Sequence, residues 1–337
     1  MNELTQGLYR AIDIARHAPS SHNSQPWRVN IISDDKSQLI AAIGFDSTRM
    51  LTTLPKLNDE MFISLGVFTG FLKKTLTAQS IEAKVQWVQK GYNIIQITLT
   101  KAAINHAYYF DESLIIERHT ARGPYLSTGL SNDQKYTLSE SMQGNIECRF
   151  IESLAEKQKI KSLVNDYAGL DFANKAVWAE TYRHIQFANQ HKDHGFTLKH
   201  LFGDVSSIFE AAFRLGFHPK NHFLYQALGM PNRLAKGLAD LMEKTPCFFA
   251  LTIKEEMPKA FYTTGLSLAD FMYQATELGL SINPVSVLLQ NDTPRKKLES
   301  LIANDRKIAF FARIGIAEHQ GIASARRSKE SICSTYI

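Results

Sequence analysis

Cysteine is scarce in this sequence. The three cysteines, Cys148, Cys247 and Cys333, lie far apart and without paired spacing, which excludes a disulfide framework and a thiolate metal site. None of the eighteen glycines lies two or five positions from another, so the dinucleotide fingerprint G-x-G-x-x-G and the P-loop are absent. H-E-x-x-H and G-x-S-x-G are missing as well. We therefore expect no metal site, no P-loop ATPase and no serine hydrolase of the common kind.

Long apolar segments and a strong net charge are also missing. No run approaches the roughly 20 residues of a membrane span, and the first residues lack the apolar core of a signal peptide. The net charge is only +5, densest at Arg326, Arg327 and Lys329, which is too weak to predict a nucleic-acid partner. These absences favour a cytoplasmic protein with neither a membrane nor a nucleic-acid partner.

Helices and short strands are predicted throughout the 337 residues, a length that suggests two domain-sized units or one large fold. The first part contains a helix at 4–17, strands at 28–33 and 38–44, a helix at 58–78, and strands at 84–89 and 93–100. The second part contains a helical stretch at 111–119, a helix-rich region at 153–244, a strand at 247–254, a helix at 262–278 and a strand at 307–316. The order of the first part recurs in the second.

The recurrence is visible in the two small-residue helices. A shift of 199 places Gly66 over Gly265 and Leu72 over Phe271, as expected of a degenerate two-fold repeat. Any two amphipathic helices can be slid into such a match, so repeat and coincidence both remain open. In a repeat, Gly66 and Gly70 would face the internal two-fold.

The segment Ala18–Trp27, with the sequence APSSHNSQPW, connects the first helix to the first strand. One interpretation is an ordinary polar loop. The other is a binding loop, because Ser20, Ser21, Asn23 and Gln25 offer neutral donors and acceptors suited to the amide edge of a planar heterocycle.

This segment resembles the flavin-binding signature of the nitroreductase superfamily. Arg118-His119-Thr120-Ala121-Arg122 resembles the R-x-S/T-x-R element by which that family holds the flavin phosphate and ribityl chain, and two arginines four apart can converge on one phosphate. Gly279-Leu280-Ser281-Ile282-Asn283-Pro284 is similar to the family's turn over the flavin ring, and Arg313 to its late phosphate-binding arginine. The resemblance implies flavin contacts from Ser20, Ser21, Asn23, Gln25, Pro26, Arg118, Thr120, Arg122, Leu280, Pro284 and Arg313. No side chain need be the catalyst, since the flavin N5 carries the chemistry.

The resemblance also implies an α+β fold, with central antiparallel sheets flanked by helices. Ordinary members are homodimers in which the arginine element precedes the first helix. In this sequence residues 1–10 lack that element, and the second half lacks a copy of the segment Ala18–Trp27, here called the serine-rich loop. A tandem pseudo-dimer with one site per chain follows, divided at 1–110 and 111–337, similar to the single-chain branch of mycobacterial dormancy-regulated proteins. An insertion at about 185–245, rich in Phe and His, is either a helical lid or a lateral extension.

The expected function is a flavin-dependent oxidoreductase of nitroreductase type. FMN is preferred over FAD, with NAD(P)H as a possible reductant and a small aromatic, nitro or quinone-like substrate. Two alternatives stay open: a dehydrogenase that oxidises a small heteroaromatic or pyrrolic alcohol, and a non-enzymatic protein that sequesters flavin. The chain is expected to be a monomeric pseudo-dimer or a weak homodimer.

Overall fold

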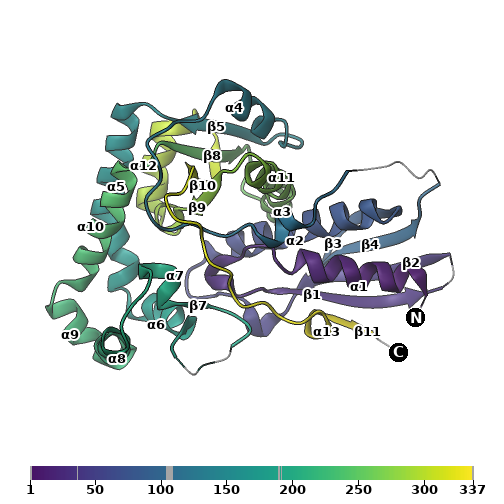
Figure 1. The fold of residues 1–337 in the computed structure, drawn as a ribbon, viewed down its shortest axis with the longest axis horizontal. Coiled ribbons are helices and arrows are strands. Elements are labelled where there is room, and N and C mark those ends of the chain that lie inside the picture. The colour runs from purple at the N-terminus through teal and green to yellow at the C-terminus, as the bar shows by residue number, and fades with distance from the viewer. Residues whose placement is uncertain (1, 36, 104–108, 189, 191, 336–337) are drawn as a thin grey trace.

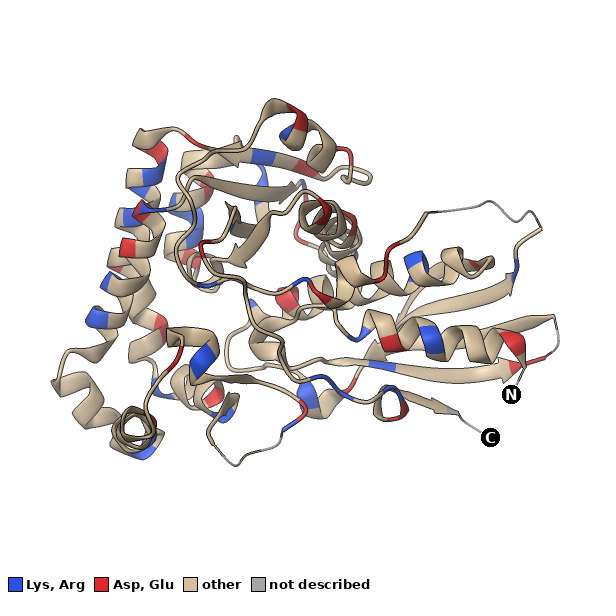
Figure 2. Cartoon of the chain, viewed as in Figure 1, with Lys and Arg blue, Asp and Glu red and all other residues tan. Residues whose placement is uncertain are grey.

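Two β-sheets packed around a central pair of helices form the frame of the protein (Figure 1). The computed structural model describes residues 2–35, 37–103, 109–188, 190 and 192–335. It confirms the α+β fold. Basic and acidic residues are interspersed over both sheets and the helices beside them (Figure 2), and no described helix is long and apolar enough to cross a membrane.

The first sheet has the strand order β11-β1-β2-β4-β3. Its strands are β1 Trp27–Asp34, β2 Gln38–Phe45, β3 Ile81–Lys90, β4 Asn93–Lys101 and β11 Cys333–Thr335, with helices α1 Glu3–Ala15 and α2 Leu57–Ala78. The pairs among β1 to β4 are antiparallel, as predicted. β11, the last described strand, lies parallel to β1, so the end of the chain completes a sheet built from its beginning.

The second sheet has the strand order β5-β8-β10-β9. Its strands are β5 Glu147–Ile151, β8 Cys247–Ile253, β9 Ser281–Pro284 and β10 Lys307–Gly315, with helices α4 Asn132–Ser139, α11 Pro258–Glu277 and α12 Asp292–Ile302. Replacing β1, β2, β3 and β4 by β5, β8, β9 and β10 reproduces the order of the first sheet, and α11 takes the place of α2 between the second and third of these strands. The same arrangement of elements therefore occurs in both halves.

The two central helices, α2 and α11, pack against each other through Gly66 and Gly265. A Cβ added to Gly66 would lie 2.1 Å from the Tyr262 carbonyl oxygen, and one added to Gly265 would lie 2.2 Å from that of Ile63. Ile63 and Tyr262 are also 199 residues apart, so the contact is reciprocal. The glycines that the sequence shift aligns are thus the residues at which the helices cross, and Gly66 faces the other half of the same chain.

The connection between β5 and β8 carries an insertion, which lies to the left of and below the second sheet in Figure 1. Its elements are α5 Leu154–Ala173, α6 Lys175–Arg183, β6 Ile185–Gln186, β7 Phe196–Thr197, α7 Leu198–Phe202, α8 Ser207–Gly216, α9 His222–Ala227 and α10 Met230–Glu243. Its aromatic residues form a separate core, in which Phe213 stacks on Phe217 and Trp178 on Tyr225, with ring centroids 4.2 and 5.3 Å apart.

Two extended arms connect the halves in opposite directions. The first arm, residues 111–126, contains the short helix α3 Ser113–Ile116, which is shorter than the predicted 111–119, and bridges the second half through Thr120–Ile282 and Tyr125–Ala317. The second arm, residues 316–335, contains α13 Lys329–Ile332 and runs back over the first half to β11 (Figure 1, yellow). The division of the chain into halves at residues 110 and 111 remains a prediction. Residues 333–335, although they belong to the second half in sequence, form a strand of the first sheet.

Candidate functional site

Two adjoining cavities open where both halves, both arms and the insertion meet. The larger has a volume of about 280 Å³. It is lined by Pro19, Ser20, Ser21, His22, Glu60, Ile63, Ser64, Val67, Arg118, Thr120, Arg122, Phe196, Leu201, Leu268, Met272, Ile282, Asn283, Pro284, Ser286, Leu289, Gln290, Ala309, Phe310 and Phe311. The smaller and more polar cavity shares six of these residues and adds Asn23, His119, Ile322, Ser324 and Arg326. The arrangement suits a ligand with an aromatic part and an anionic part.

The serine-rich loop enters the larger cavity in a conformation that side chains rarely adopt. His22, Asn23 and Gln25 have φ values of 53°, 51° and 51°, in the left-handed region that costs energy for residues other than glycine. Such a conformation persists only where the surroundings hold it. Here buried hydrogen bonds from distant segments do so.

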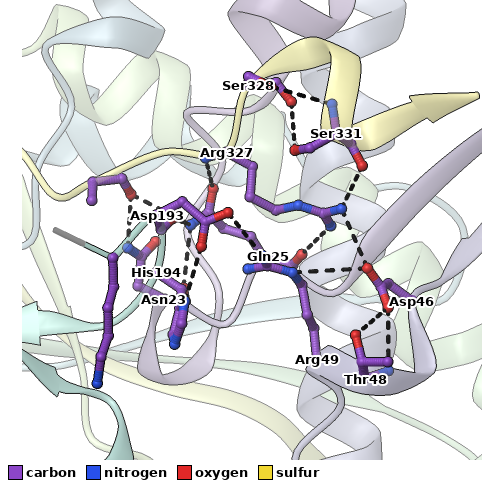
Figure 3. Close-up of polar contacts among 12 residues, drawn as sticks. Asn23, Gln25, Asp46, Thr48, Arg49, Asp193, His194, Arg327, Ser328 and Ser331 are labelled. Carbon is purple, nitrogen blue, oxygen red and sulfur yellow. Dashed lines mark hydrogen bonds and ion pairs between the residues drawn. The ribbon is translucent and has the colours of Figure 1, made fainter.

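Gln25 is the centre of these hydrogen bonds (Figure 3). Its side chain is fully buried, its amide nitrogen donates to the Asp193 carbonyl oxygen at 2.7 Å, and its amide oxygen accepts from the Arg327 backbone at 2.9 Å. The Arg327 guanidinium donates to the carbonyl oxygens of Gln25 and Trp27 at 3.0 and 2.9 Å. Both the insertion and the second arm therefore fix the loop.

Asn23 has a similar environment at the edge of the smaller cavity. Its amide nitrogen donates to the carbonyl oxygens of Gly195 and Ala325 at 3.0 and 2.9 Å. Its amide oxygen accepts from the guanidinium of Arg326. Asn23 therefore joins the same two segments that hold Gln25 and sets the position of an arginine beside the cavity.

Three arginines surround the junction of the two cavities. Arg118 is only 8% exposed and its Nε has no hydrogen-bond partner among the described residues; Nε of Arg326 is likewise unpartnered. In the described part of the chain, no ion pair with a carboxylate is formed by Arg118, Arg122 or Arg326. Burial lowers the pKa of Arg118 to about 10, and burial with the charges of Arg118 and Arg16 lowers that of Arg326 to about 9. Buried cations without counter-charges favour an anionic ligand.

Arg313 lies outside both cavity walls. It is fully buried and donates to the carbonyl oxygens of Arg122 and Gly123, each at 3.0 Å, while its guanidinium lies 4.7 Å from the Tyr125 ring centre. It thus fastens the first arm to the second half. Through that contact Arg313 determines where the backbone of Arg122 lies.

The structure brings most of the predicted binding residues together. Ser20, Ser21, Arg118, Thr120, Arg122 and Pro284 line the larger cavity, and Asn23 lines the smaller one. Gln25, Pro26, Leu280 and Arg313 line neither. Sequence reasoning missed Arg326 and Glu60, because the first stood in what looked like a charged tail and the second on an amphipathic helix, with no motif around either.

The insertion contributes two side chains, Phe196 and Leu201, to the wall of the larger cavity. The Arg122 guanidinium lies 5.7 Å from the Phe196 ring centre, within reach of a cation–π interaction. Of the other aromatic residues that suggested a lid, Phe213 and Phe217 belong to the separate core, whereas Phe223 is 80% exposed. Within the described part of the insertion, Phe196 and Leu201 are the residues that line the larger cavity, and the lid remains a prediction.

His22 is half-buried between the cavity and the insertion, with its ring centre 5.3 Å from that of His184. Burial, His184 and Arg122 together lower its pKa to about 3. At neutral pH it is therefore uncharged and adds nothing to the positive charge of the site.

A close relative covers nearly the whole chain. The sequence is 34% identical over 341 residues to "Probable NAD(P)H nitroreductase PigM" of Serratia sp. (strain ATCC 39006), covering 98% of this chain and 94% of the relative. No protein-family model matches the sequence. Similar solved structures include the FMN-dependent nitroreductase NfnB from Mycobacterium smegmatis in complex with NADPH (12% identity, 63% of this chain, 93% of that one, TM-score 0.37). Another is a nitroreductase with bound FMN from Desulfitobacterium hafniense DCB-2 (12% identity, 68% and 100%, TM-score 0.39).

Proposed function

The chain belongs to the nitroreductase family, and on this premise we propose that it is a flavin-dependent oxidoreductase that binds one FMN in the two adjoining cavities. The observation that carries the proposal is the buried Arg118, which lines both cavities and whose Nε has no hydrogen-bond partner among the described residues. An FMN phosphate would supply the missing acceptor and the missing negative charge. FAD, with its longer pyrophosphate arm, is the less favoured cofactor.

The residues present fit this cofactor. Arg118, Arg122 and Arg326 would hold the phosphate, and the hydroxyls of Ser20 and Thr120 would bond the ribityl chain. The planar ring system would lie in the larger cavity, against apolar side chains of α2, α11 and β10 that exclude water. Asn23 and Gln25 would act indirectly, because their hydrogen bonds hold the serine-rich loop and the second arm in position. Arg313 would do the same for the first arm, through its hydrogen bond to the Arg122 carbonyl oxygen.

The chemistry is redox transfer at a bound organic cofactor. When bound, a flavin exchanges hydride between NAD(P)H and a small organic acceptor. The chain's own contribution is to orient the substrate, keep the cavity dry and hold the negative phosphate. The name of the Serratia relative supports NAD(P)H as the reductant and a nitro compound as the acceptor.

We further propose that the two halves form a tandem pseudo-dimer with one site per chain, located in the cytoplasm. The shared strand order and the reciprocal Gly66–Gly265 contact support the tandem arrangement. The described cysteines are unpaired, in keeping with a reducing compartment.

The decisive test is the visible spectrum of the purified protein, recorded before and after anaerobic addition of NADPH. We expect a flavin spectrum, one FMN per chain after release and mass analysis, and bleaching by NADPH. A colourless protein that takes up neither FMN nor FAD would overturn the proposal. A bound flavin that NADPH leaves oxidised would replace the reductase with a substrate-driven dehydrogenase or a flavin store.

A further inference from the structure

Glu60 is the acidic residue among the described lining residues of the larger cavity, whose other members are arginines, neutral polar residues and apolar residues. It lies in the first turn of α2 and lines the larger cavity. Its neighbour Asp59, outside the cavity wall, pairs with Lys56 and Arg295 at 3.8 and 3.7 Å. Glu60 itself forms no ion pair within the described residues. A carboxyl group in this position is not needed to hold a flavin phosphate.

Two neutral donors hold the carboxyl group. The Ser21 hydroxyl donates to Oε2, and the Gln290 amide donates to Oε1 at 2.9 Å. Ser21 and Gln290 also line the cavity and come from opposite halves of the chain. Since a carboxylate has about four acceptor positions, each oxygen retains capacity for another hydrogen bond.

The Glu60 carboxyl group is surrounded by neutral donors and other carboxyl groups, with no cation paired to it among the described residues. Burial raises the pKa of the Glu60 carboxyl above its usual range, and Asp171 and Asp59 raise it further, against the lowering effect of Ser21 and Gln290. Asp171 is itself buried, with one carboxyl oxygen unpartnered. A ligand that brings a polar hydrogen to Glu60 therefore gains more than it would at an exposed carboxylate.

We propose that Glu60 is a specificity-determining residue that selects aromatic substrates carrying an N–H or O–H group, by accepting a hydrogen bond from that group in the larger cavity. This proposal rests on the proposed function, because it assigns the substrate class of the same site. In the structure both Glu60 carboxyl oxygens accept hydrogen bonds, from Ser21 and Gln290, and nitro groups and quinone carbonyls have no hydrogen to donate to either oxygen. The structure thereby favours a donor-bearing heteroaromatic or phenolic substrate over a simple nitro-aromatic one.

The test compares two probes of nearly equal shape, indole, which has a ring N–H, and benzofuran, which has a ring oxygen instead. Their affinities are measured by isothermal titration calorimetry for the wild type, Glu60→Ala and Glu60→Gln. We expect the wild type to bind indole about tenfold more tightly than benzofuran, the size of one hydrogen bond to a charged group. The ratio should fall close to one in Glu60→Ala and lie between the two in Glu60→Gln, which keeps a carbonyl acceptor without the charge.

Asp59→Asn is the matched control. It removes a carboxylate from the same helical turn but outside the cavity wall, so the tenfold preference should persist. An equal preference in wild type and Glu60→Ala, or no preference in the wild type, would overturn the assignment. Thermal unfolding shows whether each variant is folded. If Glu60→Ala is not folded, the indole-to-benzofuran affinity ratio of Glu60→Gln decides whether the assignment holds.

The titrations are run on flavin-loaded and flavin-free protein. A wild type that takes up no flavin overturns the proposed function, whereas the ratio of the two probe affinities still decides on Glu60. The two failures are thus distinguishable.

Discussion

The two halves of the molecule share a strand order but differ in what surrounds it. In the first half, β1 leads directly into β2, whereas in the second the connection between the equivalent strands β5 and β8 holds the whole helical insertion. The arms differ too. The first ends beside the cavities with Arg118 and Arg122, and the second passes them with Arg326 before joining the first sheet.

The place in the second half that matches the larger cavity is different in chemistry. The shift of 199 puts Lys259 where α2 has Glu60, and Thr263 where it has Ser64. Both line a pocket that also includes Asn145 and Ile146, in the loop before β5, and no arginine is among its described lining residues. Duplication of a scaffold therefore does not duplicate its site, because the site depends on loops and arms that the scaffold does not specify.

The largest effect is expected at the contact that both halves share equally. Gly66→Ala and Gly265→Ala would each force a Cβ into a backbone carbonyl of the opposite helix, so each should lower the free energy of unfolding by about 3 kcal/mol. Chemical denaturation measures the loss. Gly237→Ala in α10, with open space around it, is the control and should be neutral or stabilising. Unequal losses at Gly66 and Gly265 would contradict the reciprocal contact.

The next largest effect concerns FMN binding, which is expected at one site per chain and not at an equivalent site in the second half. Arg118→Ala should weaken FMN binding about 100-fold, because a buried guanidinium contributes charge-assisted hydrogen bonds of about 1.5–3 kcal/mol. Titration followed by flavin fluorescence gives the affinity and the number of sites. Arg10→Ala, at an exposed position, should leave both unchanged. Two flavins per wild-type chain would show that the second half keeps a site after all.

A smaller effect is expected where the second arm is fastened. Arg327 is 3% exposed and donates to three carbonyl oxygens, those of Gln25, Trp27 and Ser331. Arg327→Ala should therefore destabilise the protein by about 2 kcal/mol and make residues 316–335 sensitive to protease. Lys329→Ala is the control on the same arm. If the arm stays resistant in Arg327→Ala, other contacts hold it.

The smallest effect near neutral pH concerns the serine-rich loop. The pKa of His22 is about 3 in the folded protein and about 6.5 in an unfolded chain. Below pH 6.5 the unfolded chain binds a proton that the folded chain does not, so stability falls as the pH drops from 6.5 towards 3. Between pH 7 and pH 6 this amounts to about 0.7 kcal/mol.

Chemical denaturation of the wild type and of His22→Asn at pH 7 and at pH 6 measures the contribution of His22 to the pH dependence of stability. Asparagine is the replacement because it tolerates the positive φ of this position. The loop before β5, residues 140–146, contains no histidine, so the contribution of His22 has no counterpart at the equivalent place in the second half. An unchanged pH dependence in His22→Asn would assign it to other groups, such as His17, whose pKa burial and nearby arginines lower to about 4.

Local signals explain what could be predicted from the sequence. Most of the longer strands and helices are predicted within a few residues, because their apolar spacing is regular and their ends carry turn residues, but the helices α4 and α12 are not predicted. The short strands β5 and β9 are not predicted either, since Glu147 and Arg149 interrupt the apolar pattern of β5 and β9 spans only Ser281–Pro284. The binding loop and the arginine element were found because each is contiguous.

The rest of the site depends on partners far away in sequence. Gln25 carried the family signature, yet it bonds Arg327, 302 residues later, instead of lining the cavity. Arg326 gave no sign of its role, since adjacent arginines near a chain end are typical of an exposed tail. A single sequence contains no signal for pairs that only the folded arms bring together.

The return of the second arm has a consequence for biosynthesis. The loop around Gln25 leaves the ribosome early, but the arginine that holds it is 302 residues behind. At a translation rate of about 5–20 residues per second, roughly 15 to 60 s pass before the two can meet. The hydrogen bonds through which Arg327 holds the loop around Gln25 therefore cannot form until Arg327 has been synthesised, long after the loop itself.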